Sequence, residues 1–99
     1  MKVEILDLAR EDLIAGFEFY EFREAGIGEH FLTCLIRDIE ALESTGGTHS
    51  QPHGGYYRAL SEVFPFAIYY SVESETVRIR AIVDCRRDPE CTQSRLNAD

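Results

Sequence analysis

The 99-residue sequence lacks the features that would place it in a membrane or outside the cell. No apolar run approaches the ~20 residues of a membrane-spanning helix. The N-terminus is acidic within a few residues and has no small-residue cleavage site, so we expect no signal peptide. Three cysteines are an odd number and cannot form a fully paired disulfide framework. We therefore expect a cytoplasmic protein with reduced thiols and no membrane association.

Basic residues are scarce as well. Ten Lys and Arg, with Lys2 as the single lysine, stand against eighteen Asp and Glu, which gives a net charge of −8. Such a chain gains little from counterion release on a phosphate backbone, so we expect no direct binding to nucleic acid. The charge is uneven, because residues 56–99 hold six basic and seven acidic side chains whereas residues 1–55 hold four and eleven. The arginines of the second half that could still hold one anionic group are Arg58, Arg78, Arg80, Arg86 and Arg87.

Metal ligands are few and badly spaced. His49 and His53 lie in residues 44–55, where four glycines and a proline rule out a regular helix, so we expect two exposed loop histidines. Cys85 and Cys91 would need two further ligands to hold zinc, and Cys34 falls within a helical pattern. We expect no metal and no cofactor.

Two helices are predicted in the first half of the chain. Over residues 8–25 apolar side chains recur at Leu13, Phe17 and Tyr20, after Asp7 as a plausible N-cap. Over residues 29–43 the apolar stripe is Phe31, Leu35, Ile39 and Leu42. The short link containing Gly26 and Gly28 makes the pair an antiparallel αα-hairpin, which needs a sheet to cover.

The remaining patterns predict strands at residues 3–6, 56–60, 64–73 and 76–84. A two-residue turn at Ser74-Glu75 would pair Tyr70 with Ile79, Ile68 with Ala81 and Tyr69 with Arg80. The apolar face would then lie under the helices, and the opposite face would stay open. The residues assigned to the core are Ile68, Tyr70, Ile79 and Val83; those assigned to the open face are Tyr69, Arg78, Arg80, Arg86 and Arg87.

This order, β-α-α-β-β-β, predicts an α+β fold with the αα-hairpin packed on one face of an antiparallel sheet. We expect a single domain over residues 1–99, with residues 89–99 as a flexible tail. The pattern leaves open whether the last strand lies beside the first. It also leaves the oligomeric state open, since an unpartnered edge strand would permit a homodimer.

The second half resembles a known family. The residues that carry the resemblance are Tyr57-Arg58-x-Leu60, Phe64-Pro65-Phe66-Ala67-Ile68-Tyr69-Tyr70-x-Val72-Glu73, Val77 through Val83 and Arg86-Arg87-Asp88-Pro89. Together with the Gly-Ile-Gly-Glu-x-Phe link at residues 26–31, they resemble the RelE/ParE toxin superfamily, most of all its ParE-type plasmid-stabilisation branch. The resemblance covers about residues 3–89 and implies a toxin of a type II toxin–antitoxin system, neutralised by a cognate antitoxin.

Two activities occur in the resembled superfamily, inhibition of DNA gyrase by ParE-like members and ribosome-dependent cleavage of messenger RNA by RelE-like members. Cleavage needs a base, an acid and cations for the phosphate. RelE-like nucleases draw them from several Lys and Arg and from a C-terminal Tyr or His. Here only Arg58, Arg86 and Arg87 match cationic positions, and the tail after Val83 holds no Tyr, His or Lys. The sequence therefore favours a gyrase-binding toxin over an enzyme.

Alternatives remain open for the individual residues. A nuclease could recruit Tyr69 or His53, and an inactive relic could retain antitoxin binding. Arg58 is expected to pair with a carboxylate such as Glu62 or Glu73 more readily than to contact a target. Arg86 and Arg87 could pair with an aspartate in their turn or contact the target or antitoxin.

Overall fold

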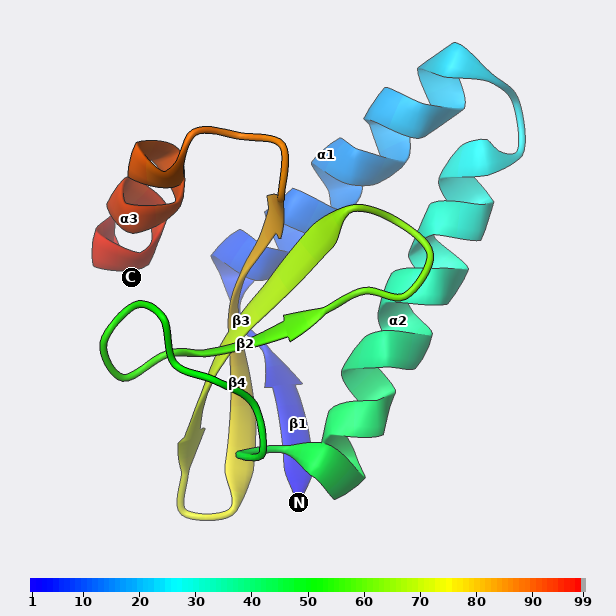
Figure 1. Ribbon diagram of the computed structural model, residues 1–99. Helices are drawn as coiled ribbons and strands as arrows, with labels where there is room; N and C mark the ends of the chain where they lie inside the picture. The colour runs from blue at the N-terminus through cyan, green and yellow to red at the C-terminus, as the bar shows by residue number, and fades with distance from the viewer. Residues whose placement is uncertain (99) are drawn as a thin grey trace.

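A computed structural model describes residues 1–98 as a four-stranded sheet between two helical layers of unequal size (Figure 1). The elements in chain order are β1 (Lys2–Ile5), α1 (Asp7–Arg23), α2 (Ile27–Thr45), β2 (Tyr57–Leu60), β3 (Phe66–Glu73), β4 (Thr76–Asp84) and α3 (Pro89–Ala98). The α1–α2 hairpin covers one face of the sheet, and α3 covers part of the other. The predicted α+β class and the αα-hairpin on one face are confirmed, but the sheet is mixed and not antiparallel throughout, because β1 pairs parallel to β4. None of the helices in the described part of the chain is long and apolar enough to cross a membrane.

The strand order is β1-β4-β3-β2, with β1 parallel to β4 and the other pairs antiparallel. The last strand therefore lies beside the first, which the sequence pattern had left open. The predicted two-residue turn is confirmed, because Ser74 and Glu75 have φ values of 49° and 62°. The pairing of Tyr70 with Ile79 that follows from this turn is confirmed too.

A β-bulge in β4 changes the register farther from the turn. Tyr70 pairs with Ile79, but Tyr69 pairs with Ala81, so Arg80 is the extra residue on the β4 side. The predicted pairing of Tyr69 with Arg80 is therefore wrong, and so is that of Ile68 with Ala81. Nothing in the alternating pattern marks Arg80 as a bulge.

The bulge also exchanges the faces of the residues that follow it. Ile82 lies in the core under α1 and α2, whereas uninterrupted alternation from Ile79 would place it on the open face. Val83 lies on the opposite face with Ala81, so its predicted place in the main core is wrong. The assignments of Ile68, Tyr70 and Ile79 to the main core are confirmed.

The C-terminal segment is not the expected tail. Residues Pro89–Ala98 form α3, which packs on the second face of the sheet; residue 99 lies outside the described residues. Leu96, with 1% of its surface exposed, contacts a small cluster made by Ala67, Tyr69, Ala81 and Val83. Arg95 ties the helix to α1, since its guanidinium lies 2.5 Å from the Asp12 carboxylate. The helix is otherwise polar, which is why apolar periodicity did not reveal it.

The main core is built around Phe31 of α2. The centre of its ring lies 5.0 Å from the centre of the Phe66 ring and 5.3 Å from the centres of the Tyr20 and Phe64 rings. Gly16 on α1 allows this packing, because a Cβ there would stand 2.5 Å from the Phe31 ring. The α1–α2 hairpin is thus fixed on the sheet, and the sheet presents its other face to α3.

Candidate functional site

Three of the predicted site residues meet in one pocket on the α3 side of the sheet. Arg58 comes from β2, Tyr69 from β3 and Arg87 from the turn after β4. The pocket has a volume of about 140 Å³. The remaining residues that line it are His53, Ala67, Val83, Asp84, Cys85, Pro89 and Thr92.

Tyr69 is the floor of this pocket and is not exposed. Only 4% of its surface is accessible, because Leu96 of α3 packs in the same cluster. The expectation that Tyr69 is a surface residue is therefore wrong. The reason is the helix in place of the expected tail. The His53 ring lies 5.6 Å from the Tyr69 ring, at the edge of the pocket.

Arg58 and Arg87 contribute positive charge that no carboxylate in the described residues neutralises at ion-pair distance. The expected pairing of Arg58 with Glu62 or Glu73 is not found, since Glu73 instead pairs with arginines of β4. Arg58 lies in the strand next to β3, with its backbone paired opposite Tyr69. The pocket therefore has an aromatic floor and two cationic walls.

Arg86 differs from its neighbour Arg87. Its guanidinium binds the Asp84 carboxylate through two hydrogen bonds of 2.9 and 2.8 Å. The hydrogen bond from the Arg86 side chain lowers the pKa of Asp84. Arg86 thus pairs with an aspartate of its own turn, which was one of the two alternatives for the arginine pair. Arg87 forms no ion pair with the described residues.

Arg78 and Arg80 lie apart from the pocket, toward the hairpin turn. Both reach the Glu73 carboxylate of β3, at 3.7 and 3.1 Å. Arg80 also donates to the Ser71 hydroxyl, and its guanidinium lies 6.0 Å from the centre of the Tyr56 ring. These contacts give both arginines a structural role at the end of the sheet.

The two loop histidines are not free solvent-exposed side chains, contrary to expectation. His49 Nδ1 lies 2.5 Å from the Tyr70 hydroxyl, which also accepts a hydrogen bond from the Gly47 backbone N–H. His53 Nδ1 lies 3.0 Å from the side-chain oxygen of Gln93 on α3. Within residues 1–98 no group of His, Cys, Asp and Glu is arranged to hold a metal ion.

Cys85 lines the pocket but is a poor nucleophile. Cys85 is exposed overall, yet partial desolvation of its thiol is the largest cause that raises its pKa, and the Asp84 charge raises the pKa further. The nearby Arg58 charge acts in the opposite direction without reversing the shift. The thiol therefore stays protonated at neutral pH.

Chemically, the pocket can hold a small anionic or planar polar group between Arg58 and Arg87, above an aromatic floor. Its volume is below the ~300 Å³ typical of small-molecule sites. Thr92 was not predicted to meet the arginines, and His53 was considered there only as a residue that a nuclease could recruit. The position of His53 depends on an irregular loop, and that of Thr92 on the unpredicted helix α3.

Comparisons with known proteins agree on the fold alone. No family model and no curated protein matches the sequence. Among solved structures, the chain is similar to a chain of the structure titled "Chromosomal ParDE TA system from P. aeruginosa". The TM-score is 0.79 and the identity 16%, and the match covers 85% of this chain and 95% of that chain. The fold is therefore ParE-like.

Proposed function

We propose that this protein is the toxin of a type II toxin–antitoxin pair and acts by binding and inhibiting DNA gyrase. The observation that carries the proposal is the ParE-like fold, shared over 85% of the chain with a chain of a ParDE toxin–antitoxin structure. The sequence resemblance at residues 57–60 and 64–89 points to the same superfamily independently of the coordinates.

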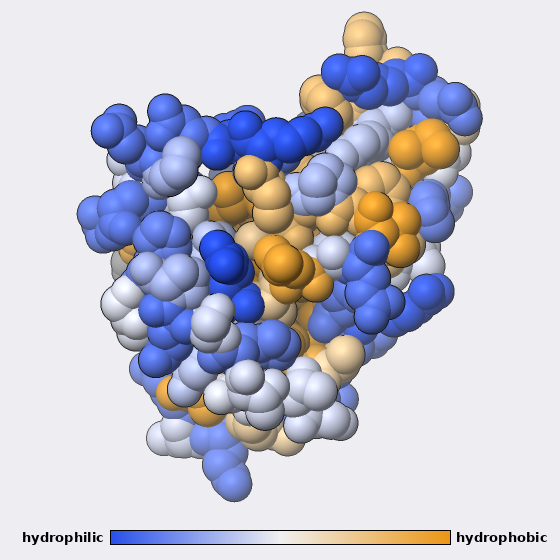
Figure 2. All heavy atoms as spheres, viewed as in Figure 1, coloured by the Kyte–Doolittle hydropathy of each residue, from blue (hydrophilic) through white to orange (hydrophobic). Residues whose placement is uncertain are grey.

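A protein partner suits the apolar surface of the α1–α2 hairpin. Ile14, Phe19 and Phe22 of α1 are 53%, 44% and 94% exposed. Figure 2 shows apolar atoms at the surface near the tip of the hairpin, next to hydrophilic ones. Exposed apolar patches on a small acidic domain mark protein contacts more than nucleic-acid contacts. We assign this surface to the cognate antitoxin.

The gyrase contact is proposed for the opposite side, at the pocket under α3. Arg58 and Arg87 are its charged groups without an ion-pair partner in the described residues, so they can bind a carboxylate or another anionic group of the target. Such a contact needs neither proton transfer nor room for a nucleotide, and the pocket volume of about 140 Å³ is sufficient for a single side chain.

Supercoiling by purified gyrase tests this proposal. We expect micromolar protein to inhibit supercoiling and the Arg58→Ala/Arg87→Ala variant to inhibit it at least about tenfold more weakly. The matched control is Arg10→Ala/Arg37→Ala, which removes the same charge from exposed positions on the helical layer and should inhibit like the wild type. Unimpaired supercoiling with the wild-type protein would contradict the gyrase target.

A second candidate is ribosome-dependent cleavage of messenger RNA, favoured by one observation. His53, which comes from the loop and not from the C-terminal tail, shares the pocket with Arg58, Tyr69 and Arg87. An imidazole beside two guanidinium groups is a set that can move a proton and hold a phosphate. This activity predicts cleavage of ribosome-bound message that His53→Gln abolishes. Intact message in that assay would exclude it.

Growth on expression without the antitoxin separates both candidates from an inactive relic. A toxin of either kind arrests growth, and co-expression of a small acidic protein from the neighbouring reading frame should relieve the arrest. Normal growth with folded protein present would favour the relic, which retains the fold and antitoxin binding alone.

A further inference from the structure

The edge of β4 that faces away from β3 is paired over only part of its length. Backbone pairing with β1 ends where the Leu6 N–H donates to the Ile79 carbonyl at 3.1 Å, because the chain then turns into α1. Pairing of β4 with β3, in contrast, continues to Asp84. The stretch from residue 80 to residue 84 therefore has a strand on one side and none on the other.

The bulge decides which groups face this open side. The Cys85 N–H donates to the Pro65 carbonyl, so residue 85 faces β3 and Asp84 faces away from it. The Phe66 carbonyl, opposite Asp84, is likewise directed away from β4, since it accepts from Ser61. By the same alternation the N–H and the carbonyl of Ile82 point to the open side, as do those of Asp84.

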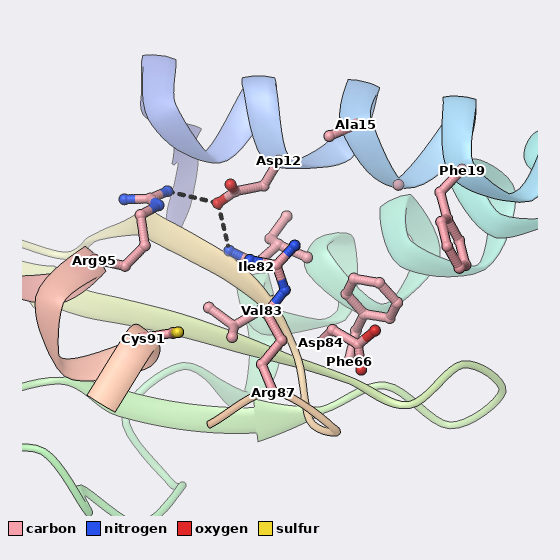
Figure 3. A pocket seen from close by; sticks show the side chains of 11 residues that line it. Asp12, Ala15, Phe19, Phe66, Ile82, Val83, Asp84, Arg87, Cys91 and Arg95 are labelled. Carbon is pink, nitrogen blue, oxygen red and sulfur yellow. Dashed lines mark hydrogen bonds and ion pairs between the residues drawn. The ribbon is translucent and has the colours of Figure 1, made fainter. Parts of the chain in front are cut away.

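Side chains satisfy part of this edge. The Asp12 carboxylate of α1 accepts the Ile82 N–H at 2.9 Å (Figure 3). The Arg95 guanidinium of α3 lies 3.4 Å from the Arg80 carbonyl. No hydrogen bond from the described residues reaches the Ile82 carbonyl or the Asp84 N–H on this side. One acceptor and one donor, two residues apart, thus remain open at the edge.

These two groups face a pocket of about 320 Å³ between α1, the end of β4 and α3. Its α1 side carries Asp12 at one end, and the rest of that side is apolar, with Ala15, Gly16 and Phe19; Phe66 of β3 continues this apolar wall. Figure 3 shows Arg87 entering from the turn after β4 and Arg95 from α3. Arg95 is paired with Asp12, whereas Arg87 has no ion-pair partner in residues 1–98.

We propose that this pocket binds an extended segment of a partner protein, which adds to the open edge of β4 as a short parallel strand. One residue of the segment, opposite Val83, donates its N–H to the Ile82 carbonyl and accepts the Asp84 N–H. In a parallel pair one residue forms hydrogen bonds with two residues of the neighbouring strand that are two positions apart, as here. β1 already pairs with this edge of β4 in the parallel direction. An antiparallel segment would need both backbone groups of Ile82, whose N–H donates to Asp12, or both of Asp84, whose carbonyl already accepts from the Arg87 N–H.

The pocket also specifies the side chains of the segment. A residue next to the paired one points to the α1 side, where Phe19 and Ala15 offer apolar contact. Arg87 follows the end of β4 in the chain, but its side chain reaches back toward Ile82 (Figure 3), so its guanidinium lies beside the segment and can bind an acidic side chain next to the apolar one. The segment is therefore expected to carry an apolar residue with Asp or Glu next to it.

A second copy of this chain is a poor occupant. Its free edge strand, β2, is Tyr57–Leu60 and carries Arg58 where the pocket calls for a carboxylate. Two arginines would then approach each other. This pocket shares Val83, Asp84 and Arg87 with the pocket assigned to the target, but Ala15 lines this pocket and not the other, and the inference does not depend on a toxin function.

A phage-displayed library of random dodecapeptides is the probe. Selection on the wild-type protein, with counter-selection on Ala15→Trp, should enrich peptides with an apolar residue next to an acidic one. Ala15 is exposed on α1, so Trp there fills the pocket without entering the core. The control Glu18→Trp places the same side chain at an exposed position of α1 that does not line the pocket, and it should bind like the wild type.

Binding and amide exchange of a selected peptide complete the test. We expect Ala15→Trp and Arg87→Gln each to weaken binding by about tenfold or more, Arg37→Gln to leave it unchanged, and the Asp84 amide to exchange more slowly in the complex. Equal binding to Ala15→Trp, peptides without an acidic residue, or an unprotected Asp84 amide would each overturn the proposal. So would a homodimer that Ala15→Trp dissociates, because the occupant would then be a second copy.

Discussion

Tyr69 and Tyr70 are neighbours in β3 and both are buried, yet they lie on opposite faces of the sheet and are held differently. Tyr70 stacks on Tyr57, 5.2 Å away, and its hydroxyl is bonded to Gly47 and His49. Tyr69 lies under α3, and no hydrogen bond to its hydroxyl is found in the described residues.

The two faces differ in size as well as in chemistry. The face under α1 and α2 holds one continuous core with several interlocked aromatic rings. The face under α3 holds five buried apolar residues, four from the strands and one, Leu96, from α3 itself. The second face also carries Arg58 and Arg87 without ion-pair partners in the part of the chain described. The first face thus provides most of the buried core of the fold. Within residues 1–98, the second face is covered only by the short helix α3 and carries the two arginines proposed to bind the target.

The largest expected effect comes from emptying the first face. Phe31→Ala removes a fully buried ring at the centre of the main core and should lower the free energy of unfolding by about 3–5 kcal/mol. Urea denaturation followed by circular dichroism measures the loss. A loss as small as that of a surface substitution would mean that the helices do not pack as described.

The matching change on the second face should cost less. Leu96→Ala is expected to lower the free energy of unfolding by about 2 kcal/mol, at the low end for a buried leucine, because α3 can detach without opening the main core. Hydrogen exchange should then show faster exchange in α3 and unchanged exchange in α1 and α2. Equal acceleration in all three helices would contradict the separation of the two faces.

The two tyrosines allow a direct comparison with one chemical change. Tyr70→Phe leaves the Gly47 N–H and the His49 ring without their partner and should cost roughly 1–2 kcal/mol. Tyr69→Phe removes a hydroxyl with no such bonds and should be close to neutral. Since burial raises the pKa of Tyr70 above its ordinary value, its phenol should ionise at a higher pH in the folded protein than in the urea-unfolded chain, and alkaline spectrophotometric titration checks this.

The smallest effect is expected at the end of β4. The Arg86 hydrogen bond lowers the pKa of Asp84, so the folded state favours the charged carboxylate more than the unfolded chain does. The contribution is present above the ordinary pKa of Asp and is lost as the pH falls through the lowered pKa. Asp84→Asn should therefore narrow the difference in urea midpoint between neutral and acidic pH. An unchanged difference would show that the pair does not contribute.

The first face could be predicted from the sequence, and the reason is its periodicity. Phe31, Leu35, Ile39 and Leu42 repeat with the helical period, and Phe66, Ile68 and Tyr70 alternate along a strand. The Ser74-Glu75 turn then set a register that the structure bears out as far as Ile79.

The second face could not be predicted, because its features carry no period. The bulge at Arg80 looks like any strand residue, and it moved Val83 from the main core to the face under α3. α3 buries only Thr92 and Leu96 among residues whose exposure is described, too few for an apolar stripe. His53 reached the pocket through a glycine-rich loop whose path depends on contacts with α3. Of the predicted site residues, Arg58, Tyr69 and Arg87 meet, whereas Arg78, Arg80 and Arg86 lie outside the pocket.

Growth arrest by paired arginine variants tests the central claim most directly, namely that the second face acts and the first face supports it. Expression of the wild-type protein should arrest growth, Arg58→Ala/Arg87→Ala should not, and Arg10→Ala/Arg37→Ala should arrest growth like the wild type, with circular dichroism showing all three folded. Arrest by the Arg58→Ala/Arg87→Ala variant at wild-type potency would contradict the account, because the two cationic walls of the pocket under α3 would then be dispensable.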